Sequence, residues 1–201
     1  MFAVIDYGVG NLFSVEKAFA AVGAEVEVTR AAEALKRADK LVLPGVGAFG
    51  DCMRNLEATG LIPVIREEIA AGKPLLGICV GLQILFEGSE ETPDAKGLGI
   101  FKGIVRKIHA PGLKVPHMGW NSIRCRQDSR LLSGLGGQPY VYFVHSYHAV
   151  PEDRGIVLAT TEYGEELTAA VAWKNVQATQ FHPEKSGDIG LRILKNFMEG
   201  E

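Results

Sequence analysis

The sequence has few cysteines, no excess of positive charge and no long apolar run. Cys52, Cys79 and Cys125 are the only cysteines among 201 residues, and their wide spacing fits neither a disulfide framework nor a metal-binding pair. The formal net charge of −3 gives no indication of nucleic acid as a partner. No apolar stretch is long enough to span a bilayer, and no basic leader precedes the first residues. We therefore expect a cytoplasmic protein that binds neither nucleic acid nor membrane.

The first half of the chain alternates strand-like and helix-like segments. The expected strands are Phe2–Asp6, Glu25–Thr29, Lys40–Leu43 and the run that ends at Cys79, and the expected helices are Asn11–Val22, Asp51–Ala58 and Leu61–Ala71. Such alternation is typical of a mostly parallel sheet that is covered by helices on both faces. Ligands of such open sheets bind at the carboxyl ends of the strands.

The second half contains short strand-like runs separated by turn residues. The expected strands are Gly103–Ile108, Trp120–Arg124, Tyr140–Val144, Ile156–Thr161, Thr168–Trp173 and Val176–Phe181. A final helix is expected over residues 186–198, with Ser186 as its N-cap. With 47% hydrophobic residues and no repeat or linker, residues 1–201 should form a single domain. The predicted fold class is α/β, with an open, mostly parallel sheet flanked by helices and an antiparallel extension in the second half.

Cys79 is the strongest candidate for a catalytic residue. It ends a short apolar strand and lies between Gly77 and Gly81, and a helical pattern follows it. A nucleophile with a glycine two residues away on either side is typical of a strand–turn–helix elbow, because the tight turn leaves no room for side chains. A helix N-terminus would also favour the thiolate. A cysteine after an apolar strand is usually only a small buried residue, but the flanking glycines favour a nucleophile.

A cysteine nucleophile needs a base and a group that orients the base. Among the five histidines, only His182 has a carboxylate at a suggestive distance, in His182-Pro183-Glu184. A residue before proline is pushed into an extended conformation, and positions 182 and 184 of an extended segment project to the same side. We therefore predict that Cys79 is the nucleophile, that His182 is the general base and then the acid, and that Glu184 fixes the tautomer of His182.

Acyl transfer also needs hydrogen-bond donors for an oxyanion. The amide of Val80 is one candidate, because it follows the nucleophile in the elbow. The glycine-rich loop over residues 43–50 is the other, since it follows a parallel strand that should lie beside the elbow. Gln83 lies four residues after Cys79, so on a helix it would share a face with the sulfur and could bind a polar substrate. A helix-capping or solvated glutamine explains Gln83 nearly as well.

Together these motifs resemble the class I, triad-type glutamine amidotransferases, in which a Gly-x-Cys-x-Gly elbow and a late His-Pro-Glu supply the triad. The similarity extends over essentially the whole chain. Further segments look like the glutaminase subunit of imidazole glycerol phosphate synthase, from histidine biosynthesis. They are residues 6–11 (DYGVGN), 44–49 (PGVGAF), 117–121 (HMGWN), 145–148 (HSYH) and 182–186 (HPEKS).

The resemblance implies hydrolysis of L-glutamine to L-glutamate and ammonia through a γ-glutamyl thioester, without cofactor or metal. We hypothesise that the amide of Val46, in the glycine-rich loop, joins that of Val80 in the oxyanion hole, and the resemblance places Gly47, Gln83, Ser146 and Tyr147 around the glutamine. Asn11, Trp120, Asn121 and Lys185 should lie near the surface that meets a partner.

The implied partner is a (βα)₈-barrel cyclase subunit, which receives the ammonia and makes imidazole glycerol phosphate and aminoimidazole carboxamide ribonucleotide. The chain has no room for a barrel domain, so we expect the two subunits to form a heterodimer.

Four other interpretations remain open from the sequence. A dinucleotide-binding module could use Gly8-x-Gly10, although Phe13 stands in place of the third glycine. A metallohydrolase could use His145, His148, His182 and Glu184, but the Cys-x-x-Cys of the zinc deaminases is absent. A different amidotransferase subunit, for anthranilate or pyridoxal phosphate synthesis, would share the chemistry and differ in partner. A non-catalytic scaffold would leave the elbow unexplained.

Overall fold

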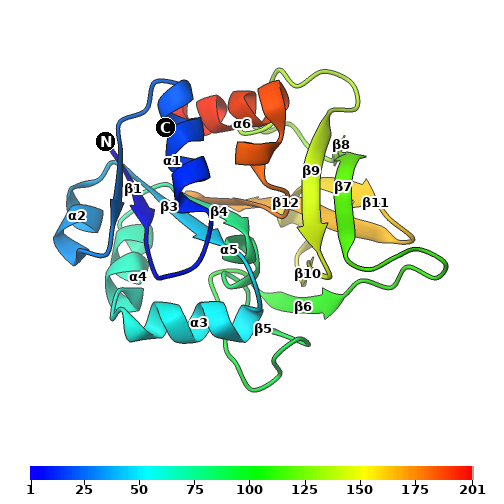
Figure 1. Cartoon of the computed structure of the whole chain (residues 1–201), viewed down its shortest axis with the longest axis horizontal. Coiled ribbons are helices and arrows are strands. Elements are labelled where there is room, and N and C mark those ends of the chain that lie inside the picture. Colours follow the sequence, from blue (N-terminus) through cyan, green and yellow to red (C-terminus); the bar gives the residue numbers. More distant parts are fainter. Residues whose placement is uncertain (201) are drawn as a thin grey trace.

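An eight-stranded mixed sheet forms the centre of the computed structural model, which describes residues 1–200 (Figure 1). Its parallel part contains, in spatial order, β2 (Val26–Thr29), β1 (Phe2–Ile5), β3 (Lys40–Gly45), β4 (Leu75–Cys79) and β13 (Val176–Thr179). Every residue of β1, β3 and β4 is buried, because helices cover both faces of a sheet of this kind. These strands therefore supply much of the apolar core.

The antiparallel part continues the same sheet beyond β13. It contains β12 (Glu166–Trp173), β11 (Val157–Glu162) and the short edge strand β8 (Arg124–Cys125). Two smaller sheets flank it, one formed by β10 (Tyr147–Pro151), β6 (Gly103–Lys107) and β5 (Gly88–Ser89), and the other by β7 (His117–Ser122) and β9 (Tyr140–His145). The mostly parallel sheet with an antiparallel second half confirms the predicted fold class.

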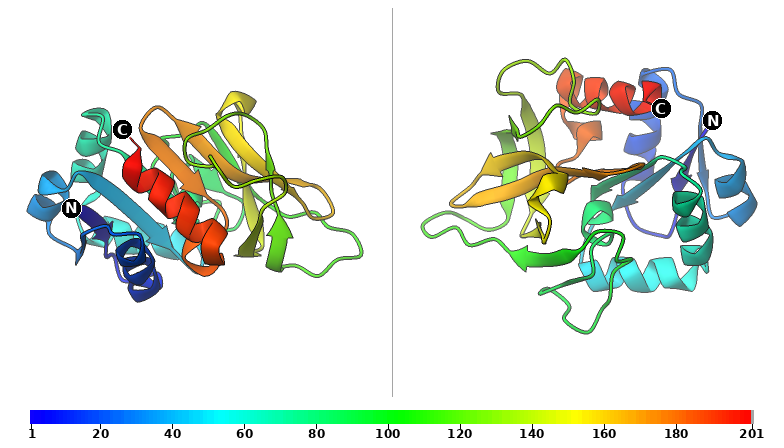
Figure 2. Two further views of the ribbon diagram at one scale, coloured as in Figure 1. Left: turned by 90° about the horizontal axis from the view of Figure 1, so that it is seen from above. Right: turned by 180° about the vertical axis from the view of Figure 1, so that it is seen from behind.

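The helices lie on both faces of the central sheet. Helix α1 (Leu12–Ala21) packs beside the C-terminal helix α6 (Gly187–Glu199) on one face, while α2 (Ala32–Arg37), α3 (Phe49–Ala58) and α4 (Ile62–Ala70) lie on the other (Figures 1 and 2). The remaining helical segments are the single turn α5 (Val80–Gln83) and two 3₁₀ turns, Arg154–Ile156 and Pro183–Lys185. Both termini lie at the end of the molecule away from the β7–β9 sheet (Figure 1). None of the helices in residues 1–200 has the length and apolar character that crossing a membrane requires.

Several elements differ from the sequence-based expectation. Helix α2 and strand β10 were not expected, and the strand expected over Trp120–Arg124 is β7, which begins at His117 and ends at Ser122. Helix α2 has only six residues and buries only two of them, so it carries too little periodicity to be recognised. Strand β10 follows β9 after a single residue, so the sequence offers no turn signal to separate the two.

Ser186 is the N-cap residue of α6, as predicted, but it does not cap the helix through its side chain. Its hydroxyl instead donates to the carbonyl oxygen of His182 at 2.6 Å and accepts from the amide of Tyr142 at 3.0 Å. Ser186 therefore connects the start of α6 to β9 and to the segment that carries His182.

Candidate active site

Three neighbouring parallel strands deliver the candidate catalytic groups to one place. Strands β3, β4 and β13 lie side by side in the sheet. The glycine-rich loop follows β3, Cys79 ends β4, and His182 lies three residues beyond the end of β13. Because the carboxyl ends of parallel strands meet at one edge of a sheet, chain segments that are far apart in sequence converge there.

Cys79 has a strained backbone conformation. Its φ of 56° and ψ of −111° place it among only two non-glycine residues with positive φ in the described chain. Such a conformation costs on the order of 1–3 kcal/mol and persists only where the surrounding structure imposes it. Cys79 is 3% exposed, and it is the last residue of β4 and immediately precedes α5. The elbow predicted from the flanking glycines is therefore present.

The glycines beside the elbow allow strand β3 to approach it closely. A Cβ atom on Gly81 would lie 1.9 Å from the carbonyl oxygen of Leu43, and one on Gly45 would lie 2.7 Å from the amide nitrogen of Gly81. Both contacts are with backbone, which cannot move aside as a flexible side chain can. Glycine is required at both positions, so the loop after β3 reaches the residues next to the nucleophile.

The helix expected after Cys79 is only one turn long. Helix α5 ends at Gln83, so its dipole is much smaller than that of a full helix.

His182 and Glu184 form a buried pair. His182 Nδ1 lies 2.7 Å from Glu184 Oε1, and both side chains are 2% exposed. The contact was expected, but the extended conformation predicted for residues 182–184 is only partly correct. His182 is extended, as expected for a residue before proline, but Pro183–Lys185 form a 3₁₀ turn rather than a continued extended segment. The turn brings the carboxylate back to the ring. Because Glu184 accepts at Nδ1, the other ring nitrogen, Nε2, is left for the thiol.

The environment of His182 favours its protonated form. Burial alone would lower its pKa, but the neighbouring Cys79 and Glu184 outweigh burial and raise the pKa to about 9. A second histidine of the same pocket, His145, behaves in the opposite way, since burial lowers its pKa to about 3. Two titratable groups whose pKa values are pushed apart in this way take different roles. His182 can therefore hold and transfer a proton near neutral pH, and His145 stays neutral.

The structure brings most of the predicted site residues around a single pocket of about 300 Å³. The lining includes the predicted nucleophile and base, both predicted oxyanion donors and all four predicted substrate-binding residues: Cys79, His182, Val46, Val80, Gly47, Gln83, Ser146 and Tyr147. Glu91, Pro116, Val144 and His145 complete it. A nucleophile, a base and backbone amides around a cavity of this size suit acyl transfer on a small substrate.

Two residues that the sequence did not single out contact the predicted site. Cys52 donates its thiol hydrogen to the carbonyl oxygen of Val46 at 3.3 Å. Burial raises the pKa of Cys52 to about 11, so it stays protonated and can donate. Gln180 is fully buried, and its Nε2 lies 3.8 Å from the sulfur of Cys79. The only feature of the sequence that could have identified Gln180 as a site residue is its position two residues before His182.

Gln83 is buried and makes two internal hydrogen bonds. Its Nε2 donates to the carbonyl oxygen of Tyr147 at 3.0 Å and to Gln180 Oε1 at 3.1 Å. A solvated or helix-capping role is therefore wrong. Among residues 1–200, the side-chain oxygen of Gln83 has no hydrogen-bond partner, so it is the part of the amide that can meet a substrate.

The predicted partner-facing residues lie in different environments. Asn11, Trp120 and Lys185 are exposed. Trp120 packs edge-to-face on Tyr142, and Lys185 Nζ lies 5.9 Å from the centre of the same ring. Asn121, in contrast, is bonded internally, because its Nδ2 contacts His117 Nε2 at 3.1 Å and donates to the carbonyl oxygen of Glu162 at 2.9 Å.

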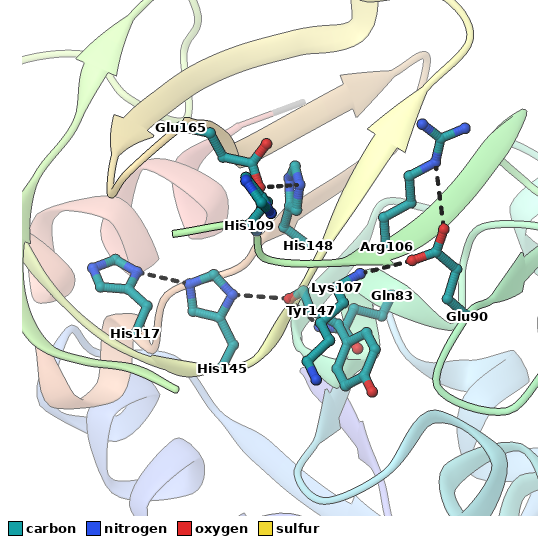
Figure 3. Close-up of polar contacts among 10 residues, drawn as sticks. All are labelled: Gln83, Glu90, Arg106, Lys107, His109, His117, His145, Tyr147, His148 and Glu165. Atoms are coloured by element: carbon teal, nitrogen blue, oxygen red, sulfur yellow. Dashed lines mark hydrogen bonds and ion pairs between the residues drawn. The ribbon is translucent and has the colours of Figure 1, made fainter. Parts of the chain in front are cut away.

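The histidines of the metallohydrolase interpretation do not surround a common point. His145 Nδ1 lies 2.9 Å from the carbonyl oxygen of Tyr147, whereas His148 Nε2 faces Glu165 at 3.9 Å (Figure 3). Within residues 1–200 no three His, Cys, Asp or Glu side chains are grouped as metal ligands would be.

Comparisons with known proteins agree with this geometry. The family model of the class I glutamine amidotransferases matches residues 3–200. The imidazole glycerol phosphate synthase subunit HisH of Aquifex aeolicus is 54% identical, over 96% of this chain and 94% of the relative. The corresponding HisH subunit of Methanothermobacter thermautotrophicus is 52% identical, over 99% and 98%.

Solved structures share the fold at lower identity. A crystal structure of a glutamine amidotransferase superposes with a TM-score of 0.76 at 23% identity and covers 98% of each chain. The glutaminase domain of a Trypanosoma brucei CTPS with bound acivicin gives a TM-score of 0.68 at 16% identity, covering 100% of this chain and 94% of that one. From the family match and the two close relatives, the chain belongs to the class I glutamine amidotransferases and, within them, to the HisH subunits of imidazole glycerol phosphate synthase.

Proposed function

We propose that the chain hydrolyses L-glutamine to L-glutamate and ammonia through a thioester on Cys79, and that it passes the ammonia to a separate (βα)₈-barrel cyclase subunit. The observation that supports this most strongly is the meeting of Cys79, His182 and the Val46–Gly47 loop around one pocket at the ends of β4, β13 and β3. The three free cysteines described by the structure fit a reducing cytoplasm. The main apolar core contains residues from both halves of the chain, which supports treating residues 1–201 as one functional domain.

In the first half of the reaction, the Cys79 sulfur attacks the carboxamide carbon of glutamine. The electron pair of the C=O bond moves to oxygen, and the amides of Val80 and Val46 stabilise the oxyanion. Collapse of this intermediate breaks the C–N bond, and His182 gives its proton to the departing nitrogen, which leaves as ammonia. Glu184 keeps the imidazole in position throughout, since it holds the Nδ1 proton.

In the second half, His182 is neutral and acts as the base. It removes a proton from water, and the resulting hydroxide attacks the thioester carbon and forms a second oxyanion at the same two amides. Collapse breaks the C–S bond, releases glutamate and restores the thiolate with a protonated His182. The hydrogen bond from Cys52 to the Val46 carbonyl sets the orientation of the loop that supplies one of these amides.

The surface beside this pocket suits a protein partner. Trp120 and Met118 are 56% and 62% exposed on the same strand, β7, and Lys185 lies next to the triad. Exposed aromatic residues of this kind are frequent anchors of interfaces. We place the cyclase on this surface, with Asn11, Trp120, Asn121 and Lys185 at or near the contact. Ammonia that passed directly between the two sites would avoid protonation in water.

The assay that tests this function measures glutamate release after the chain is mixed with the cyclase subunit and its substrate, N′-phosphoribulosyl-formimino-aminoimidazole-carboxamide ribonucleotide. Adding both should raise the rate at least about tenfold, in the usual range of coupling between sites. Trp120→Ala should reduce this stimulation. Trp173→Ala is the matched control, since Trp173 is 50% exposed and pairs with Val176 at the start of β13, at the other end of that strand from His182. A rate of glutamate release that stays the same when the cyclase and its substrate are added would contradict the proposed partner.

The pKa of His182 predicts the alkaline limit of the reaction. The acid form of His182 is needed to protonate the leaving nitrogen, and its pKa is raised to about 9. We expect kcat/KM to be insensitive to pH up to about 8 and to fall as the pH rises through about 9. Glu184→Gln removes one cause of the raised pKa while keeping the side-chain size, so the fall should move to lower pH. The α-amino group of glutamine titrates identically with both proteins, and an unchanged profile in the variant would exclude this role of Glu184.

A further inference from the structure

Two buried histidines face each other between β7 and β9. His117 and His145 occupy paired positions of this antiparallel ladder and are 2% and 6% exposed. His117 Nδ1 lies 2.9 Å from His145 Nε2, and His145 Nδ1 lies 2.9 Å from the carbonyl oxygen of Tyr147 (Figure 3). His145 lines the pocket, whereas His117 does not. The catalytic mechanism above uses neither of them.

The hydrogen bonds that link Asn121, His117, His145 and Tyr147 form a series, and the carbonyl oxygen at its end fixes the direction of each of them. The Tyr147 carbonyl can only accept, so His145 Nδ1 carries a hydrogen and donates. In a neutral ring Nε2 of His145 is then an acceptor, and His117 Nδ1 must donate to it. His117 Nε2 in turn accepts from Asn121 Nδ2 at 3.1 Å. This arrangement requires both rings to be neutral, and burial lowers the pKa of His117 to about 4 and that of His145 to about 3.

Tyr147, at one end of this series of hydrogen bonds, lines the pocket. The Tyr147 carbonyl also accepts from Gln83 Nε2 at 3.0 Å, and the same nitrogen donates to Gln180 Oε1. Gln180 Nε2 contacts the Cys79 sulfur. Tyr147 therefore lies where the histidine chain meets a second polar chain that leads to the nucleophile. The pocket wall formed by residues 144–147 cannot shift without breaking one of these bonds.

At the other end of the hydrogen-bond series, His117 and Asn121 lie on β7, the strand that also carries the exposed Trp120. His117 is the first residue of β7, and its ring is stacked between Phe143 and Tyr163, with centroid distances of 4.6 and 4.2 Å. The stacking holds the ring in place, while the two ring nitrogens make the polar connection. Packing and hydrogen bonding are thus separate properties of one side chain, and substitutions can remove either of them alone.

We propose that His117 and His145 are positioning residues for the substrate, which hold the Tyr147 carbonyl, and with it the wall of the glutamine pocket, against strand β7. This inference rests on the proposed glutaminase function. Its effect should be on KM for glutamine, because the groups concerned shape the pocket and take no part in bond breaking.

Two substitutions of His117 separate the roles. His117→Phe keeps an aromatic ring between Phe143 and Tyr163 but removes both nitrogens, which leaves His145 Nε2 without its donor. We expect KM for glutamine to rise roughly fivefold or more, with kcat within about twofold of wild type. His117→Asn loses the stacking but keeps an N–H near the Nδ1 position. It should lower the melting temperature while KM stays within about twofold of wild type.

The assay uses the complex with the cyclase subunit and its nucleotide, and wild type is measured alongside. Absence of glutamate release by wild type would refute the proposed function itself. A wild-type KM in His117→Phe together with a raised KM in His117→Asn would show that only ring packing matters and would overturn the inference.

A second measurement needs no variant and does not depend on activity. Nitrogen NMR of histidine-labelled wild type near neutral pH should find both His117 and His145 neutral and protonated at Nδ1. Protonation at Nε2 in either ring would be incompatible with the proposed chain of donors.

Discussion

Replacing Cys79 by serine should lower glutamate release in the presence of the cyclase and its nucleotide by at least about 10⁴-fold, as is typical when a nucleophile that works with its base as a unit is removed. A serine hydroxyl has a far higher pKa than a thiol and stays protonated. The substitution also removes the interaction with Cys79 that helps to raise the pKa of His182. The protein would therefore lose both its nucleophile and its preformed acid.

Cys125→Ser is the matched control for this prediction. Cys125 is a free, exposed cysteine on the edge strand β8, far from the pocket lining, so the same atomic change there should leave the rate unaltered. The fold should persist in both variants, because serine is close in size to cysteine. Retention of more than about one percent of the activity by Cys79→Ser would contradict the thioester mechanism.

Gly81→Ala should destabilise the protein by at least about 3 kcal/mol, at the upper end of the range for overpacking. The added Cβ would lie 1.9 Å from the Leu43 carbonyl oxygen and 2.9 Å from its carbon. Either β3 must move away from β4, or the elbow must open, and each change also displaces Cys79. For a chain of this size the melting temperature should fall by roughly 6–12 °C.

Gly137→Ala is the control for this change. Gly137 has an ordinary φ and nothing within 4 Å of an added Cβ, so its unfolding free energy should change by no more than about 0.5 kcal/mol. Equal stability of the two variants in thermal or urea unfolding would show that β3 does not approach the elbow as closely as described.

Regular segments were predictable from the sequence because their residue pattern is local. Strands β1 and β4 are short apolar runs bounded by turn signals, and α6 repeats apolar residues at helical spacing. The elbow was predictable because a glycine on both sides of a cysteine indicates a turn too tight for side chains. The contact of His182 with Glu184 was also expected, although the 3₁₀ turn that makes it was not.

The polar network around the pocket was not predictable, because it depends on pairing between distant segments. His117 meets His145 only through the β7–β9 register, and Gln180 reaches Cys79 only because β13 lies beside β4. Neither contact leaves a pattern in the local sequence. The same holds for Cys52, whose bond to Val46 requires the turn between β3 and α3.

The pairing of β4 with β13 has a consequence for biosynthesis. Leu75 pairs with Val176, and His182 follows that strand, so more than one hundred residues beyond Cys79 must be synthesised before the thiol acquires its acid and orienting carboxylate. A partly synthesised chain on the ribosome already contains Cys79 but lacks His182, Glu184 and most of the pocket wall. Sheet pairing over such a sequence separation is slow to form. The thiol therefore gains its catalytic partners only after most of the pocket wall has been made.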